Sequence, residues 1–246
     1  MRRKVFISII LLLAILTLNT EAETDKLSLQ IKDIDRGVTY YKIESKKEGP
    51  TAIITAGIHG DEPAGHFAAE RLKQIKINCG RLYIFPTINK SGLHKNSRYY
   101  TSNVDLNRCF PGTKRKNKGE ILANSIFEFI KKRADIVIDL HESQHFAKED
   151  SDYYGQSIIA GTNNKSILYT MNVIDKINNQ IHISLHEFIV NSHPVKNSLI
   201  WAVDKKLNKP AFMVETCKEM KLKTRIEYQL LVTKSLLKEA GVKIDE

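Results

Sequence analysis

The chain has 246 residues, a formal net charge of +10 and three cysteines. A chain of this length can bury a sizeable core without cross-links, and so few cysteines exclude a disulfide-stabilised scaffold. The positive charge is spread over scattered lysines with no nucleic-acid-binding motif, which favours a solvated basic surface over a nucleic-acid site. We therefore expect a single folded domain and no nucleic-acid partner.

The first 22 residues are predicted to be a secretory signal peptide. A basic start at 1–4 precedes an uncharged apolar run of 14 residues at 5–18, and small residues at Thr20 and Ala22 suit cleavage by a signal peptidase. The alternative is a retained membrane anchor, but such a helix spans only about 21 Å, short of a ~30 Å hydrocarbon core. We expect export to the cell envelope or the exterior, with a mature domain over 23–246 and no stable membrane insertion after cleavage.

After this segment, short apolar runs alternate with helical segments. Several of the runs are almost wholly apolar, which is typical of strands buried on both faces. This alternation predicts an α/β fold with three layers, in which a mixed, mostly parallel sheet is flanked by helices. Strands are predicted at 39–43, 52–56, 81–85, 136–140, 157–160 and 211–214, and helices at 64–76, 120–133, 165–178 and 225–240.

Polar residues stand at or after the ends of four of the predicted strands. In such sheets, ligands bind beyond the carboxyl ends of the strands, so these residues are expected just after the apolar runs and on one shared edge. The four sets are His59 with Glu62, Asn107 with Arg108, His141 with Glu142, and Glu215.

The residue types in these sets point to metal-dependent hydrolysis. Two imidazoles and one carboxylate form a three-ligand zinc site that leaves a position open for water, and zinc lowers the pKa of that water. A nearby carboxylate that is not a ligand can move the proton, and an arginine can hold an oxyanion or clamp a substrate carboxylate. Each motif alone is commonplace. Their order, shared edge and complementary chemistry together indicate a hydrolase.

The four motifs also resemble a known family. The order GIHGDE at 57–62, VDLNR at 104–108, DLHE at 139–142 and VE at 214–215 resembles the zinc carboxypeptidase superfamily. That group includes the aspartoacylase and succinylglutamate desuccinylase branch and small bacterial murein-peptide amidases. The resemblance runs from about residue 50 to residue 217, which is most of the expected mature chain.

The resemblance implies a metal centre with defined residues. His59, Glu62 and His141 match the ligands of one zinc ion per chain. Asp105 matches a carboxylate that orients His59, in keeping with the need of a metal-bound imidazole for such a partner.

The resemblance also implies the residues that act on the substrate. Glu215 matches the general acid/base, and Arg98 matches the arginine that polarises the scissile carbonyl. Arg108, helped by Asn107, matches the clamp for a free carboxylate of the substrate. The expected partner is therefore a small peptide or acyl amino acid with a free carboxylate.

Two departures from the family bear on the substrate. Carboxypeptidases carry a substrate-binding tyrosine shortly after a tryptophan-containing segment, but here Val203 stands near that place, and Tyr153 and Tyr154 are the candidates to replace it. Only 31 residues follow Glu215, which is too few for the additional β domain of typical aspartoacylases. We therefore expect the small peptidase or amidase branch.

The leading hypothesis is a secreted, zinc-dependent hydrolase that cuts an amide or peptide bond next to a free carboxylate. One alternative is an N-acyl amino acid deacylase of the aspartoacylase type. Another is an inactive zinc-binding protein that captures ligands ending in a carboxylate, although pure binding does not require Glu215. Whether Cys79, Cys109 and Cys217 pair, stay free or reach the metal is left open by the sequence.

Overall fold

The computed structural model describes residues 23–29, 37–101, 103–114 and 117–244. The predicted signal peptide lies outside the described residues. None of the helices in the described ranges is both long and apolar enough to cross a membrane.

The main sheet has eight strands and is mixed. Its members, in spatial order, are β1 (Glu23–Leu29), β2 (Val38–Glu44), β5 (Arg81–Phe85), β3 (Thr51–Ala56), β6 (Ile136–Ser143), β9 (Ala211–Cys217), β7 (Ser157–Ala160) and β8 (Ile189–Asn191). The four central strands β5, β3, β6 and β9 are parallel. β2 and β7 run antiparallel to their neighbours β5 and β9. A separate small ladder joins β4 (Ile77–Cys79) to β10 (Lys243–Ile244).

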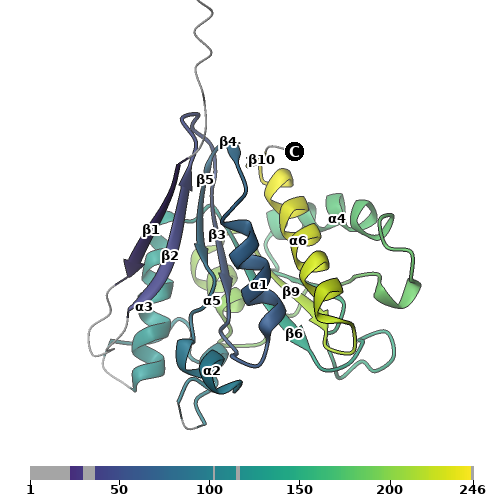
Figure 1. The fold of residues 1–246 in the computed structure, drawn as a ribbon, viewed down its shortest axis with the longest axis horizontal. Coiled ribbons are helices and arrows are strands. Elements are labelled where there is room, and N and C mark those ends of the chain that lie inside the picture. Colours follow the sequence, from purple (N-terminus) through teal and green to yellow (C-terminus); the bar gives the residue numbers. More distant parts are fainter. Residues whose placement is uncertain (1–22, 30–36, 102, 115–116, 245–246) are drawn as a thin grey trace, which may run out of the picture.

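Helices cover both faces of this sheet (Figure 1). One face packs against α1 (Pro63–Leu72), α4 (Asn164–Asn178) and α6 (Leu222–Glu239), and the other packs against α3 (Lys118–Arg133) and α5 (Leu199–Leu207). Short helices α2 (Lys90–Lys95), η1 (Leu106–Arg108) and η2 (Ser184–His186) lie in the connections. The predicted three-layer α/β fold is confirmed.

The central strands are apolar because each face has its own core. Ile54 and Ile138 point into the core beneath α1, α4 and α6, whereas Ile53 and Val137 point into the core beneath α3 and α5. All of these side chains are fully buried. Successive side chains of a strand point to opposite faces, so two covered faces require an unbroken apolar run.

The strand and helix ends differ from the prediction in two places that matter. β6 and β9 continue to pair as far as Ser143 and Cys217, beyond the predicted ends at 140 and 214. His141 and Glu215 follow their apolar runs as expected, but they lie inside the strands. The ladder can continue because it is built from backbone groups and does not depend on the polarity of the side chains. The predicted helix at 64–76 ends earlier, at Leu72, because Ile77–Cys79 forms β4 and pairs with β10.

The loop after β3 is packed tightly on α2. The Gly60 N–H donates to the Ser97 carbonyl at 2.9 Å. A Cβ atom added at Gly60 would lie only 1.9 Å from the Gly92 carbonyl carbon and 2.2 Å from the Leu93 nitrogen. Since both neighbours are backbone atoms, only a glycine fits at this position, and the residue before it is His59.

Gly60→Ala should therefore destabilise the fold and disturb the loop that carries His59. We expect the free energy of unfolding in urea to fall by about 1–3 kcal/mol, the range for overpacking a dense region. The matched control is Lys223→Ala, whose side chain is 82% exposed, and it should change stability by no more than about 0.5 kcal/mol. Equal stability of the two variants would contradict this account of the loop.

Candidate metal centre

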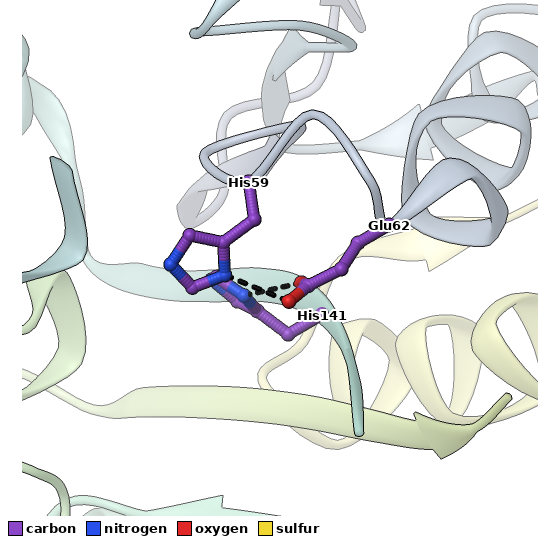
Figure 2. Close-up of side chains that lie close together, drawn as sticks. All are labelled: His59, Glu62 and His141. Carbon is purple, nitrogen blue, oxygen red and sulfur yellow. Dashed lines mark hydrogen bonds and ion pairs between the residues drawn. The ribbon is translucent and has the colours of Figure 1, made fainter. Parts of the chain in front are cut away.

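Three buried side chains meet at the carboxyl ends of β3 and β6. His59 Nδ1 lies 2.8 Å from Glu62 Oε1, and His141 Nδ1 lies 2.8 Å from Glu62 Oε2 (Figure 2). The possible ligand atoms of the three all lie within 4.8 Å of one another, and no other such group occurs among the described residues. Two imidazole nitrogens and a carboxylate are a donor set that zinc prefers, so these residues fit the predicted ion.

Both imidazoles are oriented from behind by carboxylates. His59 Nε2 lies 3.0 Å from Asp105 Oδ1, and His141 Nε2 lies 2.9 Å from Asp139 Oδ2. The other Asp139 oxygen accepts a hydrogen bond from the Thr55 hydroxyl at 2.7 Å. Holding Nε2 in this way leaves both Nδ1 atoms facing Glu62, and such support tunes a metal ligand.

The position of Asp105 agrees with its predicted role, but Asp139 was missed by the sequence reasoning. Asp139 is fully buried within β6, two residues before His141. Residues at i and i+2 of a strand point to the same face. An aspartate inside an apolar run at this spacing from a candidate ligand is therefore a signal that could have found it.

The charges at this centre favour an ionised Glu62 and a more neutral Glu215. Burial opposes ionisation of Glu62, but the imidazoles of His59 and His141 outweigh burial and hold its pKa well below the usual range. Burial raises the pKa of Glu215 to about 7. Its Oε2 has no hydrogen-bond partner in the described part of the chain. A carboxyl in this state can both take and release a proton near neutral pH.

Arg98 is tied to the metal centre through Asp105. Asp105 Oδ2 accepts hydrogen bonds from Arg98 Nε at 3.2 Å and Nη2 at 3.0 Å. The remaining nitrogen, Nη1, lies 3.3 Å from His59 Nδ1 and 3.5 Å from Glu62 Oε1. One carboxylate therefore orients a candidate ligand and also holds the guanidinium at the edge of the ligand set.

A cavity of ≈ 210 Å³ opens beside these residues. Its wall contains six of the eight residues predicted from the sequence, and the two that do not line it, His141 and Asp105, contact the lining residues Glu62 and His59. The predicted residues in the wall are His59, Glu62, Arg98, Asn107, Arg108 and Glu215.

Asn107 and Arg108 enter this wall from η1. Asn107 is buried, and its side-chain oxygen accepts a hydrogen bond from the Leu199 N–H at 3.0 Å, which fixes it against the start of α5. Arg108 is exposed, and its Nη1 donates to the Asn107 carbonyl at 2.9 Å. An accessible guanidinium in the cavity wall suits a substrate carboxylate, which it can bind through two parallel hydrogen bonds.

The rest of the wall was missed by sequence reasoning, except for two tyrosines and Glu142, which was expected at this edge of the sheet. Tyr153 and Tyr154 both line the cavity, whereas Val203 is fully buried in α5 and does not. Met213 lies two residues before Glu215 on the same strand face, so its place could have been found from the strand period. The wall residues that the sequence did not single out are Ser143, Gln144, Ile159, Val195, Ser198 and Met213.

The three cysteines are not part of the candidate ligand set, although the Cys109 thiol donates to the Asp105 carbonyl at 3.4 Å. Cys79, Cys109 and Cys217 form no disulfide with one another, and none belongs to the group that could hold a metal. Burial raises the pKa of the Cys217 thiol to about 11, which disfavours the reactive thiolate.

Comparison with known proteins supports this assignment of the fold. Residues 48–149 match the succinylglutamate desuccinylase/aspartoacylase catalytic domain. This range contains all three candidate ligands, whereas Glu215 lies beyond it. N-alpha-acetyl-L-2,4-diaminobutyric acid deacetylase of Halomonas elongata is 34% identical over 105 residues, which cover 40% of this chain and 30% of that protein.

Solved structures with the same fold include carboxypeptidases and desuccinylases. The mDAP-bound Helicobacter pylori Csd4, a D,L-carboxypeptidase, matches with a TM-score of 0.72 and 23% identity over 80% of this chain and 52% of that chain. A succinylglutamate desuccinylase from Silicibacter matches with a TM-score of 0.66 and 18% identity over 92% of this chain and 69% of that chain. The chain thus spans about half of Csd4 and under a third of the deacetylase. The match over 48–149 confirms the predicted resemblance to the desuccinylase/aspartoacylase branch, and the solved structures confirm a zinc carboxypeptidase-like fold.

Proposed function

We propose that the protein is a zinc-dependent hydrolase that cleaves an amide or peptide bond next to a free carboxylate. The observation that carries the proposal is a single cavity whose wall joins candidate ligands His59 and Glu62 to Glu215 and Arg108. Relatives named carboxypeptidase, desuccinylase and deacetylase support hydrolysis of an amide bond.

Each of the candidate side chains has a distinct role in such a reaction. Zinc bound by His59, Glu62 and His141 would supply a water of lowered pKa. Glu215 then takes a proton from the attacking water and delivers it to the leaving amine, for which a pKa of about 7 is suited. Arg98, held at the edge of the ligand set, donates to the scissile carbonyl oxygen as negative charge develops there.

Arg108 selects substrates that carry a free carboxylate next to the scissile bond. Its guanidinium is accessible in the cavity wall, and the buried Asn107 fixes the backbone oxygen that it contacts. A cavity of ≈ 210 Å³ suits one amino-acid residue or a short acyl group rather than a folded protein. The substrate class is therefore a small peptide, with murein peptides favoured if the protein is exported.

A second candidate is an N-acyl amino acid deacylase. It is favoured by the desuccinylase/aspartoacylase match over 48–149 and by the deacetylase with 34% identity. The same residues would serve, but the product would be acetate or succinate rather than an amino acid. A zinc-binding protein without turnover remains the third alternative, and the proton-accepting Glu215 argues against it.

Arg108→Lys should weaken binding of substrates with a free carboxylate. The loss of two parallel charge-assisted hydrogen bonds should raise KM roughly 10- to 100-fold, because Lys cannot reproduce the planar fork. The measurement is hydrolysis of C-terminal peptides, murein peptides and N-acyl amino acids, each offered with a free carboxylate and as the amide. For the amides, KM should stay within about twofold of wild type, since uncharged groups bind the guanidinium weakly.

The exposed Arg71 on α1 supplies the matched control, and Arg71→Lys should leave every KM unchanged. Release of acetate or succinate with peptides untouched would instead support the deacylase. Tight binding across the panel without turnover would support the recognition protein.

Glu215→Gln should abolish most of the activity while zinc stays at one ion per chain. The amide cannot accept the proton, so we expect kcat to fall by about 10²- to 10⁴-fold. Activity and metal analysis on the same preparation check this. The control is Glu219→Gln, since Glu219 is 43% exposed and does not line the cavity. Unchanged activity in Glu215→Gln, or no stoichiometric zinc in the wild type, would overturn the proposal.

We also propose that the protein is exported after removal of residues 1–22. The basic start, apolar run and small residues of that segment support this proposal. Expression of the full chain in a bacterial host should give a product whose intact mass begins at Glu23, recovered from the envelope or the medium. A full-length product retained in the cytoplasm or in the membrane would contradict it.

A further inference from the structure

One buried side chain of α6 bridges the two strands that carry His141 and Glu215. Gln229 is fully buried, and its Nε2 lies 2.6 Å from the His141 carbonyl and 3.3 Å from the Val214 carbonyl. It also lies 3.1 Å from the Thr216 hydroxyl oxygen. Because carbonyls only accept hydrogen bonds, the amide nitrogen must face them. The Gln229 Oε1 has no partner among the described residues, so the amide is engaged on the strand side.

A second polar side chain on the same helix face reaches the same region. Arg225, one turn earlier, pairs with Glu142 Oε1, and Glu142 Oε2 accepts a hydrogen bond from the Ala64 N–H at 2.8 Å. The Glu142 N–H donates to Glu62 Oε2 at 3.1 Å. Residues four apart on a helix share a face. Thus α6, which crosses β9 and β6 (Figure 1), supports the metal centre from behind at two points.

We infer that Gln229 is a positioning residue that sets the separation between His141 and Glu215. These two residues are direct partners in the β6–β9 ladder, which ends only two residues later, at Ser143 and Cys217. The side-chain amide of Gln229 donates to the carbonyl of His141 on β6 and to the carbonyl of Val214 on β9. It therefore fixes this end of both strands. A displacement of about 1 Å between a ligand and a proton carrier can cost 10²-fold in rate. The inference rests on the proposed function.

The test compares Gln229→Met with Thr233→Val in the zinc-loaded protein. Met keeps the approximate volume of Gln but has no donor. Thr233 lies one turn further on α6, is equally buried, and its hydroxyl has no partner in the described residues, so its loss should be neutral. For Gln229→Met we expect kcat to fall about tenfold or more at nearly constant KM. Zinc affinity, measured against a chelator, should also fall by about 10-fold. Thr233→Val should stay within about twofold in all three.

Zinc affinity separates this inference from the proposed function because its measurement needs no substrate. A wild type that binds zinc without turnover would overturn the proposed function, while a weaker zinc site in Gln229→Met would still support positioning. A Gln229→Met variant that melts earlier but keeps wild-type zinc affinity and kcat would overturn the inference, as would losses of equal size in Thr233→Val. If Gln229→Met does not fold, Thr216→Val replaces it in the test, because this change removes one acceptor of the Gln229 amide. We expect kcat of Thr216→Val to fall about threefold. An unchanged kcat would overturn the inference.

Discussion

The carboxylate of Glu62, shared between two imidazoles, is the interaction on which the rest of the site depends. An ionised carboxylate at 3% exposure is costly unless its oxygens are bonded. Here Oε1 faces His59, and Oε2 faces His141 and accepts from the Glu142 N–H. Glu62 also stands at the N-terminus of α1, where the helix dipole favours negative charge. A loop, a strand and a helix therefore converge on one ionised group, which is also the natural place for a divalent cation.

The sheet makes this convergence possible because its centre is closely packed. A Cβ atom added at Gly65 of α1 would lie 2.8 Å from the Leu140 carbonyl oxygen, so this glycine lets the helix start approach β6. Behind His141, Asp139 and Thr55 extend the polar chain from β6 across to β3, within an otherwise apolar core. Such a buried network stabilises the fold only when every polar group in it has a hydrogen-bond partner, because an unpaired buried polar group is costly. The hydrogen bonds of the fold therefore orient the candidate ligand His141 themselves.

The sequence predicted the part of the site that depends on local pattern. His59 and Glu62 were found because a polar turn follows an apolar run, and the parallel order of the central strands then placed His141 and Glu215 on the same edge. What could not be predicted depends on packing between distant segments. Ile159 lines the cavity only because β7 runs antiparallel to β9, an arrangement that no local pattern specifies. Likewise, the helical period marks Gln229 as inward-facing but does not say which strands it meets.

The residues proposed for catalysis and the rest of the cavity wall also come from different parts of the fold. The residues proposed to act on the scissile bond come from the parallel centre of the sheet and its loops, where their positions are fixed by the shared edge. Ile159, Met213 and the two tyrosines Tyr153 and Tyr154, which also line the cavity, come from the β6–β7 connection and the antiparallel β7–β9 pair. The shape of this part of the cavity therefore depends on how the β6–β7 connection packs against the sheet, whereas the candidate ligands depend on the parallel strands and their loops.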